Sequence, residues 1–272
     1  MNEETEVLEL AKRIRLDSLR MTSVANASHI GSCLSIADIL AVLYSGVLRI
    51  DPINPEWPER DRFIMSKGHA AAACFAVLAE KGFFDKKLLD TYCHDGSILG
   101  GHVTRGVPGV EISTGSLGHG LSIGGGMALW AKRLEKSYRT FVVLSDGECD
   151  EGSTWEAALF ASHHKLDNLT VIIDYNKIQS FGFVKEVLDL EPLVAKWESF
   201  GWKVTEIDGH NIREIRGALS QVPFERTIPS CLVAHTVKGK GVSFMENNLA
   251  WHYKSANREQ LDQAVDEIVN SK

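Results

Sequence analysis

Residues 140–183 read TFVVLSDGECDEGSTWEAALFASHHKLDNLTVIIDYNKIQSFGF, and this stretch predicts a strand, a helix and a second strand. The runs 141–144 and 169–174 are apolar on both faces, which is typical of strands buried in a parallel sheet. Between them, 154–164 has a helical pattern, for which we expect Thr154 to be the N-cap. A helix that joins two parallel strands brings their carboxyl ends to one edge of the sheet, where open α/β proteins bind ligands.

A carboxylate and an amide follow these two strands. Asp146 ends the first strand and Asn176 the second, so we expect their oxygens to lie close together. Oxygen ligands without a thiol or an imidazole favour Mg²⁺ or Ca²⁺, and Mg²⁺ in such a place usually helps to hold phosphate oxygens. The simpler alternative is that Asp146 and Gly147 only form a turn and Asn176 only a loop. The spacing of the pair, each just past an apolar strand, favours the metal.

The composition excludes several classes of function. The net charge is −7 and no basic cluster stands out, so we expect no nucleic-acid partner. The charged N-terminus does not resemble a signal peptide, and the apolar run 70–79 is too short to span a membrane. The cysteines are scattered and form no Cys-x-x-Cys pair, which indicates reduced thiols in a cytoplasmic protein. They are Cys33, Cys74, Cys93, Cys149 and Cys231.

Strands alternate with helices along the whole chain, which predicts an α/β fold with a mainly parallel sheet flanked by helices. No linker, repeat or low-complexity tract interrupts 1–272, so we expect a single domain. Further strands are predicted at 62–65, 203–207 and 230–235. Further helices are predicted at 6–25, from Ser35 onward, at 70–81 and at 85–93. A Gly/Ala-rich helix is predicted to follow the turn at 113–120 and to continue to about 134. The last helices are predicted at 192–200, at 212–221, and from an Asn257 cap to 269.

The glycines around 115–126 could indicate a dinucleotide site, but their spacing is one residue off that fingerprint. No clear strand precedes them, and no acidic residue ends a following strand at the usual distance, so a nicotinamide site is disfavoured. A glycine-rich helix start can still hold an anion through backbone N–H groups, or simply pack closely.

Four histidines lie in loops beside small residues: His29, His69, His102 and His252. Taken singly, a loop histidine is usually solvated or structural. Imidazole also serves as a donor to anions and as an acid or base near neutral pH. We find no His-Glu-x-x-His or similar spacing, so zinc is not expected.

The runs SDGECDEGSTWEAA and LDNLTVIIDYNKIQ resemble the thiamine diphosphate motif, Gly-Asp-Gly followed by a later Asn. The Glu-Gly-x-x-Trp-Glu-Ala continuation resembles the transketolases in particular. Ser145 replaces the first Gly of the motif, Ser116 stands where Pro is frequent, and QSFG replaces Gln-x-Asp-Gly after Asn176. The resemblance implies the diphosphate-binding (PP) type of fold.

The resemblance also implies roles for individual residues. Mg²⁺, with Ca²⁺ or Mn²⁺ as substitutes, would be held by Asp146, Asn176 and the carbonyl of Ile178. Thiamine diphosphate would be bound by His69, Gly115, Ser116, Leu117, Gly147 and Asn176. The catalytic group would be His29, His102, His252 and Glu151. For Glu151, a plain role at a helix N-terminus is the simpler alternative.

The resemblance covers only the first part of a complete transketolase, so it implies a split enzyme. A separate pyrimidine-binding subunit would complete the site, in an α2β2 heterotetramer that transfers a two-carbon ketol unit between sugars or sugar phosphates. Three alternatives stand beside this interpretation. The first is a 2-oxoacid dehydrogenase E1 subunit, which is not expected to carry these loop histidines. The others are a nicotinamide oxidoreductase and a non-catalytic binding module.

Overall fold

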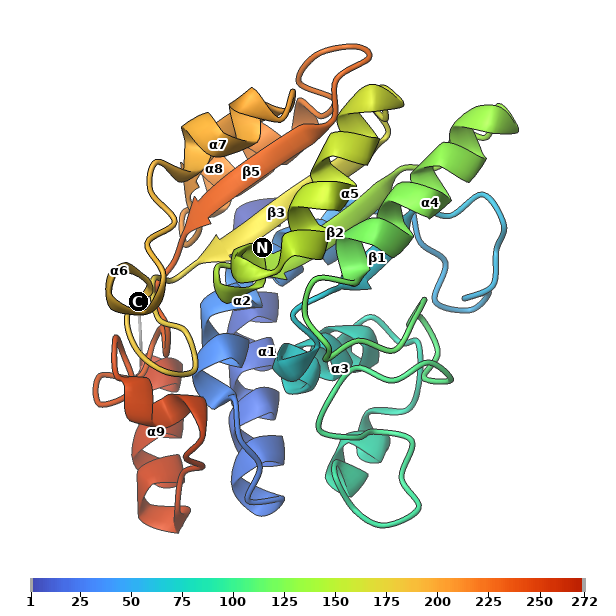
Figure 1. Cartoon of the computed structure of the whole chain (residues 1–272). Helices are drawn as coiled ribbons and strands as arrows, with labels where there is room; N and C mark the ends of the chain where they lie inside the picture. The colour runs from blue at the N-terminus through green and yellow to red at the C-terminus, as the bar shows by residue number, and fades with distance from the viewer. Residues whose placement is uncertain (1, 271–272) are drawn as a thin grey trace.

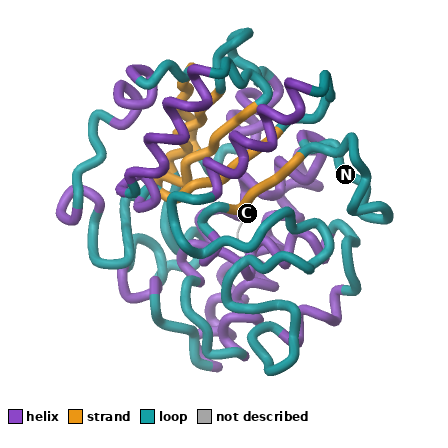
Figure 2. The backbone as a smooth tube through the Cα atoms, turned by 45° about the vertical axis from the view of Figure 1, so that its right-hand side comes forward, coloured by secondary structure: helices purple, strands orange, loops and turns teal. Residues whose placement is uncertain are grey.

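A five-stranded parallel sheet forms the centre of the computed structural model, which describes residues 2–270 (Figure 1). The strand order is β1-β2-β3-β5-β4. The bounds are β1 Arg62–Met65, β2 Thr140–Ser145, β3 Leu169–Tyr175, β4 Lys203–Asp208 and β5 Ser230–His235. Figure 2 shows the strands as one layer between helices. The predicted α/β class with a parallel sheet is confirmed.

Nine α-helices lie within the described residues. They are α1 Glu3–Val24, α2 Ile30–Val42, α3 Ala71–Glu80, α4 Gly120–Arg133, α5 Gly152–His163, α6 Val184–Val187, α7 Leu193–Ser199, α8 Ile212–Ser220 and α9 Arg258–Asn270. Short 3₁₀ helices are η2 Gly68–Ala70, η3 Lys86–Thr91, η4 Gly147–Asp150 and η5 Leu249–His252, and a π-helical turn, η1 Leu43–Val47, extends α2.

The sheet separates two apolar cores, because alternate side chains of a strand point to opposite faces. On β2, Phe141 and Val143 pack with α1, α2, α3, α8 and α9. Val142 and Leu144 pack on the other face with α4, α5 and α7. Burial on both faces explains why β2 reads as an unbroken apolar run.

The start of α2 differs from the prediction. The helix begins at Ile30, after His29 in the left-handed conformation (φ 77°), and not at Ser35. A capping box predicts a start only where the hydroxyl caps the helix. Here the Ser35 hydroxyl is buried inside α2 and donates to Asp174 Oδ2 at 2.6 Å.

The segment Ile30–Val47 is long and apolar enough to cross a membrane by length and composition, alone among the helices described. It is 83% buried inside the protein, which is typical of a core helix. Ser32, Ser35 and Asp38 interrupt the apolar run, which hides its length in the sequence.

The N-cap of α5 also differs from the prediction. The helix begins at Gly152 with Glu151 as the cap residue, whose backbone is extended. Thr154 is already inside the helix, and its hydroxyl donates to the Glu148 carbonyl at 2.8 Å. The short 3₁₀ helix η4 lies between β2 and α5 and contains the residues Gly147–Asp150.

Candidate cofactor site

The carboxyl ends of β2 and β3 lie side by side, because Ser145 pairs with Asp174 in the parallel ladder. Asp146, 2% exposed, joins the two strand ends. Its Oδ1 accepts a hydrogen bond from Gly147 N at 2.8 Å, and its Oδ2 accepts one from Lys177 N at 2.7 Å. The carboxylate is therefore held by backbone groups that follow both strands.

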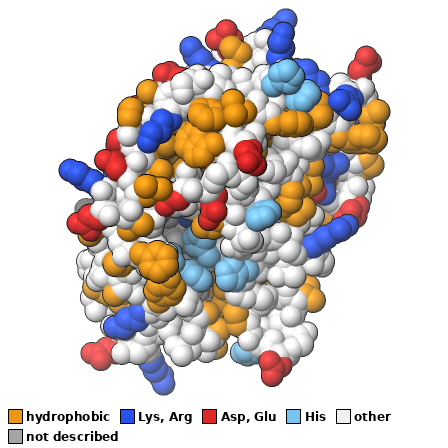
Figure 3. Space-filling view, in the orientation of Figure 1, with side chains coloured by type: hydrophobic (Ala, Val, Ile, Leu, Met, Phe, Trp, Pro, Cys, Tyr) orange, Lys and Arg blue, Asp and Glu red, His pale blue; other side chains and the backbone are white. Residues whose placement is uncertain are grey.

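A cavity of about 430 Å³ opens at these strand ends. Every site residue named from the sequence lines it except Ser116. These are His29, His69, His102, Gly115, Leu117, Asp146, Gly147, Glu151, Asn176, Ile178 and His252. Figure 3 shows histidine side chains gathered in a hollow on this face. The fold thus brings together residues from seven separate segments of the chain.

The four loop histidines form one cluster. The ring centre of His29 lies 5.3 Å from His69, 5.6 Å from His102 and 5.1 Å from His252. Burial, aided by His102 and Lys238, lowers the pKa of His29 to about 4. Burial lowers the pKa of His252 to about 3 and that of His69 well below its usual value. These three rings are neutral at pH 7, and each then has one N–H donor and one acceptor nitrogen.

The oxygens at the strand tips fit a hard cation. In the part of the chain that the structure describes, Asp146 has no ion-pair partner, although it is buried. Burial and the charge of Asp174 raise the pKa of Asp146 to about 6. An uncompensated buried carboxylate is costly, and a metal ion removes that cost.

The rest of the predicted metal set lies in the same wall of the cavity. Asn176 Oδ1 accepts from Ile178 N at 3.1 Å, and the Ile178 carbonyl faces Lys238 Nζ at 2.8 Å. Among residues 2–270, no three His, Cys, Asp or Glu side chains cluster as metal ligands do. One carboxylate, one amide oxygen and one carbonyl instead make an oxygen set, which suits Mg²⁺ or Ca²⁺ better than zinc.

Lys238 is a cavity residue that was not predicted from the sequence. It is 1% exposed and donates both to the Ile178 carbonyl and to His252 Nδ1, each at 2.8 Å. Burial lowers the pKa of Lys238 to about 8, although Asp146 acts in the opposite direction. One signal was available: Lys238 follows β5, whose carboxyl end lies at the same sheet edge as those of β2 and β3.

A buried ion pair lies under the cavity and was also missed. Lys67 and Asp174 are both fully buried and form an ion pair. Lys67 Nζ also donates to the Ser32 carbonyl at 3.2 Å, while Asp174 accepts from Ser35 and Thr236. Burial opposes ionisation of Asp174, but Lys67 outweighs it and lowers the pKa of this carboxyl.

The glycine loop before α4 is held by a buried carboxylate. Glu148 Oε1 accepts from Gly118 N at 2.9 Å and from the Ser66 hydroxyl. At Gly115 the backbone has φ +144°, and a Cβ there would lie 2.8 Å from the His102 ring. Only glycine fits this approach of the loop to the histidine cluster. In the sequence, nothing except its place in the motif indicated that Glu148 supports the site.

Glu151 lines the cavity at the start of α5. Its side chain makes no capping hydrogen bond to the helix. Its place as the cap residue still fits the simpler role at a helix N-terminus, so both interpretations of Glu151 stay predictions.

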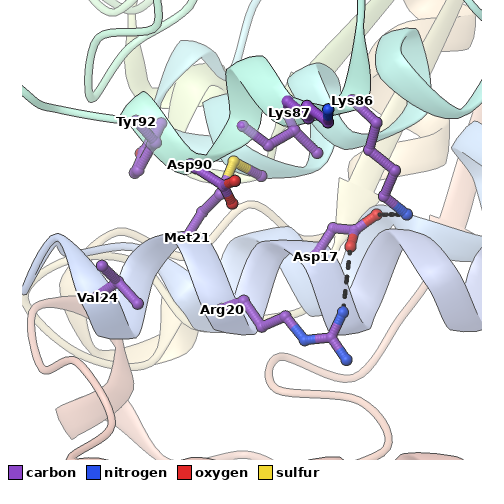
Figure 4. Close-up of a pocket in the computed structure, with 9 residues that line it drawn as sticks. Asp17, Arg20, Met21, Val24, Lys86, Lys87, Asp90 and Tyr92 are labelled. Carbon is purple, nitrogen blue, oxygen red and sulfur yellow. Dashed lines mark ion pairs between the residues drawn. The ribbon is translucent and has the colours of Figure 1, made fainter.

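A second cavity of about 400 Å³ lies between α1 and η3, away from the strand ends (Figure 4). Asp17 lies in it between Lys86 at 2.8 Å and Arg20 at 3.8 Å. None of the site residues predicted from the sequence lines this cavity. Asp17, Arg20 and Lys86 are already paired with one another, and we assign no ligand to this cavity.

Comparison with known proteins identifies the family. Residues 7–267 match the family described as transketolase, thiamine diphosphate binding domain. The chain is 42% identical to one of the subunits of the apulose-4-phosphate transketolase of Phocaeicola vulgatus, over 97% of this chain and 95% of that protein. It is also 42% identical to the 6-deoxy-6-sulfo-D-fructose transketolase subunit SqwG of a Clostridium species, over 98% of this chain and 97% of that protein.

Solved transketolases share the fold. The enzyme from Campylobacter jejuni superposes with a TM-score of 0.90 and 31% identity, over 99% of this chain but only 43% of its own. The enzyme from Leishmania mexicana gives a TM-score of 0.92 and 28% identity, over 97% of this chain and 41% of its own. The chain therefore spans less than half the length of these transketolases. The family match, the two subunit relatives and the strand-end cavity together show that this chain belongs to the transketolase family, as its thiamine diphosphate-binding domain.

Proposed function

We propose that this chain is the diphosphate-binding subunit of a two-subunit transketolase. It would act with a separate pyrimidine-binding subunit to transfer a two-carbon ketol unit from a ketose to an aldose. The observation that carries the proposal is the cavity at the ends of β2 and β3, where the buried carboxylate of Asp146 and the histidine cluster line one space.

In this proposal the strand tips hold the metal and the diphosphate. Asp146, Asn176 and the Ile178 carbonyl would bind Mg²⁺, or Ca²⁺ or Mn²⁺ in its place. The diphosphate would lie against Gly147, His69 and the loop of Gly115, Ser116 and Leu117. Ser116 does not line the cavity, so it would contribute through its backbone. When bound, the thiazolium ring of the cofactor supplies the carbon that takes up the ketol unit.

The histidine cluster would handle the sugar. His29 and His252 are neutral and lie in one cavity with His102, so both can donate hydrogen bonds to sugar hydroxyls, and His29 can also accept a proton from one. Glu151 would act at the cavity wall near the partner subunit. Because these groups come from different loops, the sugar would be held from several sides before any bond breaks.

Two observations support a partner subunit. The named relatives of the same length are called transketolase subunits. Large apolar side chains are also exposed on α4 and α5, which contact each other (Figures 1 and 3). They are Ile123, Trp130, Leu159 and Phe160, with Leu134 just after the end of α4. Since Glu151, the cap residue of α5, lines the cavity, a chain on this face could also reach the cavity. We propose an α2β2 assembly in the cytoplasm.

The relatives act on more than one kind of sugar, judging by their names. Two relatives of equal identity are named for different ketoses, one a sugar phosphate and the other a sulfonated sugar. Residues that recognise the distant end of the sugar would belong to the partner subunit.

The test is reconstitution. This chain is purified, mixed with the product of a neighbouring reading frame that carries a pyrimidine-binding domain, and assayed for ketol transfer with thiamine diphosphate and Mg²⁺. We expect activity only from the mixture. Ketol transfer by this chain alone would contradict the split-enzyme proposal, and decarboxylation of a 2-oxoacid by the mixture would favour the E1 alternative.

A further inference from the structure

The hydrogen bond between Lys238 and His252 determines where the imidazole carries its proton. Lys238 Nζ lies 2.8 Å from His252 Nδ1. A lysine ammonium has donors and no acceptor, so Nδ1 must be the acceptor in this pair. A neutral His252 then carries its proton on Nε2 and presents an N–H donor there.

His252 is neutral under ordinary conditions. Burial and the neighbouring Lys238 lower its pKa to about 3. A doubly protonated ring could not accept at Nδ1, so the hydrogen bond itself also requires the neutral form. The ring lines the cofactor cavity, so an Nε2–H is available to a hydroxyl or a phosphate oxygen inside it.

The backbone just before Lys238 is in turn held by a chain of hydrogen bonds that leads away from His252. The backbone N–H of Val237 donates to His210 Nε2 at 2.8 Å. Because that nitrogen accepts, neutral His210 carries its proton on Nδ1, which lies 2.7 Å from Asp38 Oδ2. Asp38 is bound in turn by both terminal nitrogens of Arg15, at 3.0 and 2.5 Å.

This chain of contacts connects α1, α2 and the β4–α8 turn to the loop that carries Lys238. Its side chains are mostly buried, with 11% of Arg15, 7% of Asp38 and 12% of His210 exposed. The loop has another anchor, because Gly239 N donates to the Gly31 carbonyl at 3.0 Å. The His210 side chain thus accepts a hydrogen bond from the backbone of Val237, the residue just before Lys238.

We propose that Lys238 and His210 are positioning residues for His252. His210 holds the backbone at Val237, Lys238 reaches from the next residue to His252 Nδ1, and His252 is fixed as the tautomer with its proton on Nε2. The proposed function supplies the nature of the ligand, a sugar hydroxyl or phosphate oxygen. The tautomer follows from this chain's own contacts.

The first test is nitrogen NMR of the intact chain labelled with ¹⁵N-histidine, in which long-range ¹H–¹⁵N spectra distinguish the two tautomers. The signals of His252 are identified by their loss in His252→Gln. We expect the Nε2–H form in the wild type and a mixture with the Nδ1–H form in Lys238→Met. The proposal is overturned if the wild type shows the Nδ1–H form, or if Lys238→Met leaves the tautomer unchanged.

The second test uses two substitutions at His210 that each keep one of its hydrogen bonds. His210→Gln places an amide oxygen near the position of Nε2 and keeps an acceptor for Val237 N. His210→Asn places its amide near Nδ1 and keeps only the donor to Asp38. We expect acetic anhydride to acylate Lys238 at least tenfold faster in His210→Asn than in the wild type, and His210→Gln to stay within about threefold, as measured by mass spectrometry.

His235→Asn is the matched control, since His235 Nε2 also pairs with a carboxylate, Glu206, at 2.9 Å but does not bind Val237 N. Asp38→Asn tests the same link with His210 in place, and we expect it to give faster acylation as well. Wild-type acylation rates in both His210→Asn and Asp38→Asn would remove His210 from the proposal.

Neither test requires cofactor or partner subunit. They can fail while reconstitution succeeds, and reconstitution can fail while the tautomer is as expected. The two proposals are therefore separable by experiment.

Discussion

Asp146 is the residue at which the metal proposal is most directly testable. Asp146→Asn keeps the shape of the side chain and removes its charge. Charged hydrogen-bonding groups contribute about 1.5–3 kcal/mol, so we expect the Kd for thiamine diphosphate with Mg²⁺ to rise roughly 10- to 100-fold. Isothermal titration calorimetry on the isolated chain measures this.

Asp150→Asn is the matched control, because Asp150 lines the same cavity but is not in the proposed metal set. We expect its Kd to stay within about threefold of the wild type. Equal losses in the two variants would show that overall negative charge in the cavity matters, and not a metal ligand at Asp146.

Asp38 gives a pH-dependent contribution to stability. Burial alone would raise its pKa, but Arg15 and His210 lower the pKa to about 2, below the ordinary 3.8. The folded state therefore favours the charged form. This stability is fully present above about pH 4 and is lost as the pH falls through the folded pKa near 2.

We expect Asp38→Asn to reduce the free energy of unfolding by roughly 2–4 kcal/mol at pH 7. The difference from the wild type should shrink as the pH is lowered from 7 to 3, because the wild-type carboxylate then loses its advantage. Urea unfolding at the two pH values measures this. A difference that stays constant, or grows, at pH 3 would contradict the assigned pKa direction.

At the scale of elements, α4 packs on β2 through a glycine. A Cβ at Gly124 would lie 2.5 Å from the Val142 side chain, whereas a Cβ at Gly126 meets nothing within 4 Å. We expect Gly124→Ala to lower the free energy of unfolding by about 1–3 kcal/mol, because the helix must move away from the sheet. Gly126→Ala in the same helix should raise it by about 0.5–1 kcal/mol.

Both variants are measured by thermal and urea unfolding. Stabilisation by both would mean that helix propensity outweighs packing at Gly124. The opposite signs also test whether this glycine-rich helix serves close packing, which was one of the two interpretations that its sequence left open.

The secondary structure was predictable wherever one periodic signal dominated. The strands β1 and β5 have the predicted bounds, since each is a short apolar run between polar residues. The start of α2 was not predictable, because His29 adopts a left-handed backbone that no propensity indicates, and a misleading capping pattern lies at Ser35. The N-cap of α5 was predicted at Thr154 for a similar reason, because the short helix η4 before it has no periodic pattern in the sequence.

Most of the residues around the cavity were predictable for a different reason. Asp146 and Asn176 follow strands directly, so their placement comes from topology, and the loop histidines came from the family resemblance. Lys238 and the Lys67–Asp174 pair were missed because their significance depends on partners distant in the sequence. Asp174 in particular looked like the last residue of an apolar strand, although it is a buried charge.

At the scale of the whole molecule, the exposed apolar side chains on α4 and α5 predict where the partner subunit binds. Trp130 is 60% exposed, and a buried tryptophan at an interface commonly contributes about 2 kcal/mol or more. We expect Trp130→Glu to weaken the association with the pyrimidine-binding chain by at least about 30-fold, with no loss in thermal stability of the isolated chain.

Sedimentation velocity of the mixed subunits measures this association. Ile53→Glu is the control, because Ile53 is 95% exposed in the loop before β1. Unchanged association of Trp130→Glu, or equal weakening by both variants, would place the interface elsewhere on the molecule.

The Lys67–Asp174 pair has a consequence for how this chain can evolve. Either substitution alone would leave the other charge in a dry interior, at a cost of about 3–5 kcal/mol, whereas replacing both by apolar residues of similar volume can be neutral. The two residues lie 107 positions apart in the sequence, yet selection should act on them as a pair. Descendants of this gene are expected to keep both charges or to lose both, with single-change lineages short-lived.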